Sequence, residues 1–165
     1  MNWETALDIH TKAAASLLTA AEKISAEHWH SPLAEGKWSA GQIVEHLNVT
    51  YDVLRTDLEG GTGMKVVTSF FQRIALRFTV LPKILQGTGF PAGVRAPREL
   101  RPAEAADKDA ALATFRERSA RFLDLAKSAH AQGRKVSHAY FGKGSVLEAV
   151  ALSGRHVDHH RMQLE

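Results

Sequence analysis

Arg155-His156-Val157-Asp158-His159-His160-Arg161-Met162-Gln163-Leu164 is the stretch from which fold and site are best approached, because it places three histidines within five positions. The stretch has the composition of a helix. At 3.6 residues per turn, His156 and His160 lie about 40° apart around the axis and one turn apart along it. His159 is displaced by about 100° from His160, so one ion cannot easily use all three. We expect His156 and His160 to act as the pair, because the small residues Ala149 and Ser153 lie on their face and leave room for an ion and a ligand.

A second histidine lies upstream, in Trp38-Ser39-Ala40-Gly41-Gln42-Ile43-Val44-Glu45-His46-Leu47. Ser39 and Gln42 have the spacing of a capping box, and Trp38 and Ile43 occupy the positions of a hydrophobic staple. A helix is therefore predicted from Ser39 to about Leu58. His46 falls on its mostly apolar face, which should point into the protein.

Three neutral imidazoles would converge on one point if the fold brought His46 against His156 and His160. Such an arrangement holds a divalent metal and leaves a coordination position open. A lone histidine at position 46 would be explained as a hydrogen-bonded core residue. Burying three imidazoles without a shared partner costs free energy that a metal would recover. The spacing by itself leaves both interpretations open.

Four further segments complete the expected fold. Apolar residues recur at helical spacing over residues 3–25, 64–85 and 107–131, and a Ser145/Glu148 capping box opens the last helix. No hairpin or alternating strand pattern is evident. Four long helices with an extra helical insertion between the second and third predict an all-α four-helix bundle in one domain, residues 1–165.

The composition limits which residues could bind a metal and which kinds of partner the protein could have. The net charge of +3 over 165 residues is too small to indicate nucleic-acid binding. The chain has no cysteine, so any metal must be bound by His, Asp or Glu. The first residues do not resemble a secretory signal, and no apolar run has the roughly 18 residues of a membrane span. We expect a soluble cytoplasmic protein with a small-molecule substrate.

The segment from Gln86 to Pro102 contains three glycines and three prolines without periodicity. Connections of this length are unusual in compact domains unless they have a function, such as that of a lid or a binding loop. Arg95, Arg98 and Arg101 lie within it. We treat these three arginines as candidates for binding an anionic substrate or cofactor.

Three motifs resemble those of a known family. Residues 38–47 resemble the W-S-x-x-x-I-x-x-H-L signature of the DinB-like superfamily, and residues 156–164 resemble its closing H-x-x-H-H-x-x-Q-L signature. Residues 138–142 are similar to an H-P-x-F-G stretch from an uncharacterised branch of that superfamily, with Ala139 in place of proline. The three motifs occur in the family order between residues 38 and 164.

The resemblance implies a bundle in an up-down-down-up arrangement with a divalent metal on three histidines, which by position are His46, His156 and His160. Zinc or nickel is the expected metal, with iron as a further candidate. Members of the family include thiol-dependent transferases and metal-dependent hydrolases. The implied function is activation of a low-molecular-weight thiol or of water, for transfer or hydrolysis on a small molecule. Homodimers are common in the family.

The catalytic acid or base stays open among Glu45, His138 and His159. Glu45, Asp158 and Glu148 lie near the ligands in sequence and could instead orient an imidazole as hydrogen-bond acceptors. For each carboxylate taken alone, a position on a solvated helix face is the more ordinary explanation.

A non-catalytic bundle is the alternative function. Its metal site would be structural or vestigial, and it would act through a dimer or partner surface. The extra helical segment supplies aromatic and basic residues for a dimer or membrane-surface contact, although we expect the aromatic residues to be buried within the monomer. These residues are Phe70, Phe71, Ile74, Phe78, Arg73 and Arg77.

Overall fold

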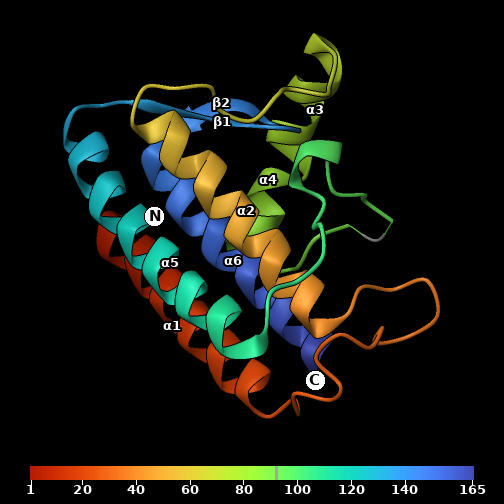
Figure 1. Ribbon diagram of the computed structural model, residues 1–165. Helices are drawn as coiled ribbons and strands as arrows, with labels where there is room; N and C mark the ends of the chain where they lie inside the picture. Colours follow the sequence, from red (N-terminus) through yellow and green to blue (C-terminus); the bar gives the residue numbers. More distant parts are fainter. Residues whose placement is uncertain (92) are drawn as a thin grey trace.

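The protein is described by a computed structural model that covers residues 1–91 and 93–165 (Figure 1). Five α-helices longer than two turns, a short α-helix, a 3₁₀ turn and a two-stranded hairpin make up the described chain. In chain order they are α1 (Trp3–Glu22), α2 (Ala40–Leu58), α3 (Phe70–Thr79), α4 (Leu81–Gln86), η1 (Arg98–Leu100), α5 (Lys108–Ala131), β1 (Lys135–His138), β2 (Gly142–Ser145) and α6 (Val146–Leu164).

Helices α1, α2 and α5 fix the first part of the topology. Asn48 on α2 donates to the Ala111 carbonyl near the start of α5, at 3.3 Å, and Arg134 after α5 donates to Leu58 at the end of α2. The two helices therefore run in the same direction. Helix α1 runs against α5, because Trp3 at its start stacks on His130 at the end of α5, with ring centroids 4.8 Å apart.

Helix α6 completes the bundle beside α1. The backbone of Gly154 lies directly against His10, and Ala20 and Arg161 farther along the two helices border one shallow surface pocket. The two helices are thus parallel, and the bundle is up-down-down-up, as the resemblance implied. Figure 1 shows the four long helices packed side by side, with α3 projecting at one end and α4 beside α6.

Capping boxes define three of the helix starts. Ser39 and Gln42 cap α2, and Ser145 and Glu148 cap α6, both as predicted. Ser69 and Gln72 form a third box at α3. In each case the serine side chain accepts from the backbone N–H three residues on, and that residue's side chain accepts from the serine N–H. Local sequence therefore sets where α2 and α6 begin, and with them the position of all three candidate ligands.

The insertion differs from the single helix expected over residues 64–85. It consists of α3 and α4, which meet at Val80, and residues before Ser69 are not helical. Pro82 lies in the first turn of α4, where its missing N–H costs nothing. The proline therefore starts a new helix instead of extending the previous one.

The hairpin β1–β2 was not predicted. Its strands pair antiparallel from Lys135 opposite Ser145 to His138 opposite Gly142. Each strand has only four residues, and β2 contains two glycines, which have low strand propensity. Gly142 has a φ of +67°, a value that a glycine adopts without strain. The hairpin matters for the candidate site because its first strand ends at His138.

The expectation that the aromatic residues of the insertion are buried within the monomer is wrong. Phe70, Phe71 and Phe78 are 60%, 80% and 79% exposed. Helix α3 contacts the remaining structure through Leu76, which packs on a small apolar cluster, and through Arg77, which binds the hairpin. Within the described residues, no helix combines the length and apolar character that a membrane crossing requires.

Candidate metal centre

Three imidazoles from two antiparallel helices meet at one point. His46 comes from α2, and His156 and His160 come from successive turns of α6. The Nε2 atom of His156 lies 3.2 Å from that of His46 and 3.1 Å from that of His160. The candidate ligand atoms of all three residues lie within 4.8 Å of one another. The structure thus brings together the three histidines that sequence reasoning selected.

Hydrogen bonds at Nδ1 fix two of the rings. His46 Nδ1 lies 2.6 Å from the Leu100 carbonyl oxygen, and His160 Nδ1 lies 2.9 Å from Gln163 Oε1. Because each partner can only accept, the protons are assigned to Nδ1. The Nε2 lone pairs of both rings are then free and point toward His156. This is the usual arrangement by which outer-shell acceptors prepare histidines for a metal.

The carboxylates considered for this orienting role are engaged elsewhere or make no such contact. Glu148 binds Arg77, and Asp158 pairs with Arg161. Glu45 forms no hydrogen bond to a ligand histidine within the described part of the chain. The acceptors are instead a loop carbonyl and an amide. Gln163 lies three residues after His160, so helical spacing could have identified it, whereas nothing in the sequence pointed to Leu100.

The spacing of the Nε2 atoms fits a divalent metal. With metal–nitrogen distances of about 2.1 Å, neighbouring ligands lie about 3.4 Å apart in a tetrahedron and about 3.0 Å apart in an octahedron. The observed 3.1 and 3.2 Å fall between these values. His156 Nε2 lies at this separation from both other nitrogens, and the lone pairs repel one another unless a cation or a proton lies between them, so the donor set suits a divalent metal.

Burial keeps the cluster in the neutral form that metal binding requires. Desolvation lowers the pKa of His46, lowers that of His156 well below its usual value, and lowers that of His160 to about 3. Mutual repulsion between the rings acts in the same direction on His156 and His160. Neutral imidazoles can ligate without first losing a proton near pH 7.

The cluster borders a cavity of about 1030 Å³. Its walls come from α2, α6, the α3–α4 insertion, the hairpin and the connection between α4 and α5. Apolar side chains predominate, among them Trp38, Ile84, Phe90, Phe141 and Leu152. The ring of Trp38 lies 5.0 Å from that of His46. A cavity of this size and character can enclose a small organic molecule beside the three histidines.

His138 also lines this cavity, in a fixed tautomer. Its Nδ1 atom accepts from the backbone N–H of Tyr140 at 3.2 Å and of Phe141 at 3.4 Å, and its ring stacks on Phe141. Burial, followed by the nearby Arg77, lowers its pKa to about 4. The proton of the neutral ring is thus on Nε2, which leaves one N–H donor for the cavity.

His159 lines the cavity but stands apart from the ligand group. Gln163 Nε2 donates to His159 Nε2 at 3.2 Å, and the Phe90 ring lies 5.3 Å from the imidazole. Its pKa is lowered by burial, against the opposing effect of Asp158. The single amide of Gln163 therefore contacts both His159 and His160.

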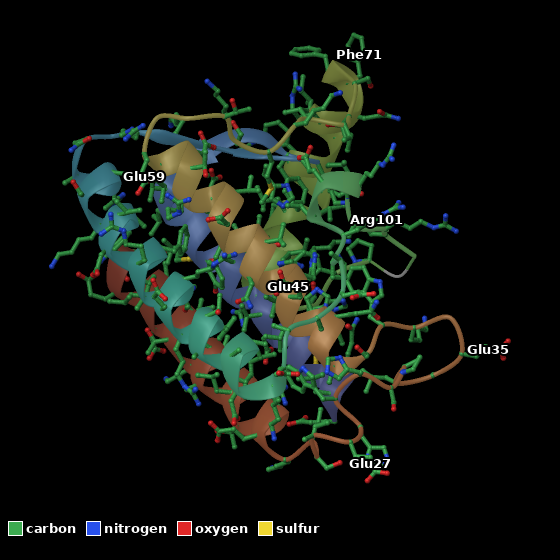
Figure 2. The ribbon with its side chains drawn as sticks, in the orientation of Figure 1. Glu27, Glu35, Glu45, Glu59, Phe71 and Arg101 are labelled. Atoms are coloured by element: carbon green, nitrogen blue, oxygen red, sulfur yellow. The ribbon has the colours of Figure 1, made fainter. Side chains whose placement is uncertain are left out.

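Of the other candidate residues predicted from the sequence, only some border the cavity. Arg95 and Arg101 border the cavity, whereas Arg98 and Glu45 are absent from its described lining. Figure 2 labels Glu45 on α2 and Arg101 on the connection between α4 and α5. Arg95 also contributes its carbonyl, which accepts from the Tyr140 hydroxyl at 2.6 Å. The connection expected to serve as a binding loop thus forms part of the cavity wall.

A family model for the DinB superfamily matches residues 9–164. The chain belongs to the DinB superfamily. It also resembles the solved structure of YfiT from Bacillus subtilis, described as a probable metal-dependent hydrolase with an unusual four-helix bundle topology. The TM-score is 0.59 at 17% identity, over 98% of this chain and 82% of that chain, a likeness that establishes the fold. No curated protein matches the chain.

One part of this DinB-superfamily site was missed by sequence reasoning. Arg77 of α3 forms an ion pair with Glu148 of α6, in which its Nη2 lies 3.0 and 3.1 Å from the two carboxylate oxygens. Its Nη1 donates to the carbonyls of Phe141 and Lys143. Burial raises the pKa of Glu148, but hydrogen bonds from Ser145 and Arg77 outweigh it and the net shift is downward. The pair fastens the insertion and the hairpin to α6 beside the cavity.

Proposed function

We propose that this protein is a divalent-metal-dependent enzyme that activates a low-molecular-weight thiol or water for transfer or hydrolysis on a small molecule. One observation carries the proposal: three imidazole Nε2 atoms converge, 3.1 and 3.2 Å apart, at the wall of a cavity of about 1030 Å³. A purely structural ion would need no adjoining space, whereas a catalytic one needs an open position that a substrate can reach.

His46, His156 and His160 would hold the metal, with zinc or nickel as the proposed ion. A divalent metal bound there supplies a Lewis acid that lowers the pKa of a water or thiol ligand. The chain has no cysteine, so an attacking thiol would have to come from outside the protein. Leu100 and Gln163 orient two of the rings through their Nδ1–H groups.

Two further histidines are assigned roles in the cavity. The Nε2–H of His138 would donate to a substrate oxygen, because its Nδ1 is already occupied by two backbone N–H groups. His159 would act as a proton donor through its Nδ1–H, because its Nε2 accepts from Gln163. Glu45 lies outside the described cavity lining, so we assign no role to it.

The cavity walls indicate the substrate class. Apolar residues would surround a hydrocarbon or aromatic part of the substrate, and Arg95 and Arg101 would face an anionic substituent. Arg98 stays a prediction from loop position alone. A substrate with an apolar body and one acidic group satisfies both features.

Elemental analysis of the purified protein tests the metal site. We expect near-stoichiometric zinc or nickel in the wild-type protein and in His159→Ala, and its loss in both His46→Ala and His160→Ala. His159→Ala is the matched control because it removes a neighbouring imidazole that does not join the cluster. Wild-type protein that failed to bind added zinc and nickel would overturn the proposal.

Removing the metal separates catalysis from the alternative of a structural site. With a chelator, a catalytic site should lose thiol-transfer or hydrolytic activity while the free energy of unfolding falls modestly. A structural site should instead lose folding stability together with its ion. His138→Phe should keep the metal and lower the rate, which distinguishes a substrate contact from a ligand.

A further inference from the structure

The exposed side of α3 forms an aromatic face on the surface of the protein. At 100° per residue, four apolar side chains fall within an arc of about 100° on this helix. Their exposed fractions are high for residues of this type. They are Phe70 (60%), Phe71 (80%), Ile74 (39%) and Phe78 (79%). Figure 2 shows Phe71 at the outermost tip of the insertion, directed away from the bundle. We call these four residues the aromatic face.

The aromatic face is held in place by two other side chains of the same helix. Arg77 links α3 to Glu148 of α6 and to the Phe141 carbonyl of the hairpin, and Leu76 packs against the apolar cluster beneath. The Ser69 capping box fixes the start of the helix. Specific contacts therefore hold α3 in an orientation that exposes four apolar side chains. Packing within the protein does not explain this exposure.

The segment of the chain that carries this face is basic. Residues 60–98 contain six lysines and arginines and no aspartate or glutamate, so this quarter of the chain carries +6 and the remaining chain carries −3. The Arg73 guanidinium lies 5.8 Å from the centre of the Phe70 ring, and exposed Lys143 follows the hairpin turn beside Arg77. Neither Arg73 nor Lys143 forms an ion pair within the described residues.

We propose that the aromatic face of α3 docks on an anionic lipid surface. Phenylalanine on one side and arginine or lysine beside it are the features of helices that lie in the membrane interface, where the rings enter the acyl boundary and the cations meet anionic headgroups. A second copy of this chain fits less well, because a two-fold interface would place the basic segments opposite one another. This surface is separate from the metal centre and does not depend on the proposed function.

Docking through α3 has a consequence for the cavity. The inward side chains of the insertion, including Leu76, Leu81 and Ile84, form part of the cavity wall. The lipid-facing and cavity-facing sides thus belong to one small element. A lipid surface at α3 would bring the cavity close to molecules dissolved in the membrane interface.

Co-sedimentation with vesicles tests the proposal. The probes are vesicles of phosphatidylcholine alone and vesicles with 30 mol% phosphatidylglycerol. We expect at least tenfold stronger binding to the anionic vesicles, a loss of at least tenfold in Phe71→Ser/Phe78→Ser, and several-fold weakening in Arg73→Gln/Lys143→Gln. Met162→Ser, which removes another half-exposed apolar side chain at the far end of α6, is the matched control and should bind like the wild type.

Three results would overturn it: no binding to either vesicle, equal binding to both, or unchanged binding in the double phenylalanine variant. Circular dichroism and thermal unfolding of each variant should match the wild type, because the substituted phenylalanines are about four-fifths exposed. Light scattering during gel filtration completes the test. A dimer that Phe71→Ser/Phe78→Ser dissociates, without vesicle binding, would assign the face to a second copy of the chain instead.

Discussion

Gln163 Oε1 accepts a hydrogen bond from His160 Nδ1 at 2.9 Å, one helical turn beyond the ligand it orients. The same amide donates to His159 Nε2 at 3.2 Å. One side chain therefore places both neighbouring histidines in the Nδ1–H tautomer, with different results at Nε2: the Nε2 lone pair of His160 is left for a metal, and that of His159 is occupied. This difference explains why only one of the two adjacent histidines belongs to the cluster.

Replacing Gln163 should weaken the metal site without removing a ligand. In Gln163→Ala, His160 loses its acceptor, and we expect metal affinity to fall by about 10- to 100-fold. Gln163→Glu keeps an acceptor at that position and should retain the affinity. Competition with a chromophoric chelator measures both, with Met162→Ala as the neighbouring control. Equal affinities in the alanine and glutamate variants would contradict the orienting role.

Acid should destabilise the metal-free protein through His10. This side chain is fully buried beside Tyr51, 2.8 Å from its hydroxyl, and burial lowers its pKa from 6.5 to about 4. Between these pH values the unfolded chain binds a proton that the folded chain does not. Stability should therefore fall as the pH decreases, by about 1.4 kcal/mol per pH unit from this residue.

Urea unfolding with a chelator, from pH 7.5 to pH 5, measures this dependence. His10→Gln should reduce the slope of unfolding free energy against pH by close to one proton, although its stability at pH 7.5 also changes. His28→Gln alters an exposed histidine and should leave the slope unchanged. Identical slopes in the wild type and His10→Gln would show that His10 does not titrate as expected.

The ion pair of Arg77 should contribute more to the free energy of unfolding than most surface ion pairs of this protein. Arg77→Ala removes bonds to Glu148 and to two carbonyls, and we expect a loss of about 1–3 kcal/mol. Arg116→Ala is the control, since Arg116 pairs with Glu22 where both side chains are half exposed, and it should change stability by less than about 1 kcal/mol. Equal effects in denaturant titrations would mean that the insertion is held by other contacts.

Gly154 should tolerate no side chain. A Cβ at this position would lie 2.7 Å from the Cα and 2.8 Å from the backbone nitrogen of His10, across the α1–α6 contact. Gly154→Ala should destabilise the protein by about 1–3 kcal/mol, although alanine favours a helix by about 1 kcal/mol. Ser128→Ala, on the exposed side of α5, should stay within about 0.5 kcal/mol. A thermal unfolding series would check both, and a stabilised Gly154→Ala would contradict the close packing.

The sequence by itself determined the four bundle helices and which histidines could act together. Helical periodicity and the capping boxes at Ser39 and Ser145 are local signals, because a helix satisfies its hydrogen bonds within a few residues. The four-residue spacing of His156 and His160 follows from the same geometry. These features were confirmed because nothing distant in the chain has to be known to predict them.

Only the tertiary structure decided what surrounds the three histidines. The carbonyl of Leu100, 54 residues after His46, accepts from its ring, and the hairpin carries His138 to the cavity. The structure also placed Phe70, Phe71 and Phe78 on the outside, although their apolar character predicted burial. Residue type sets the free energy that a side chain gains on burial. Whether the chain packs another element against that side chain depends on contacts between distant segments, which no local pattern contains.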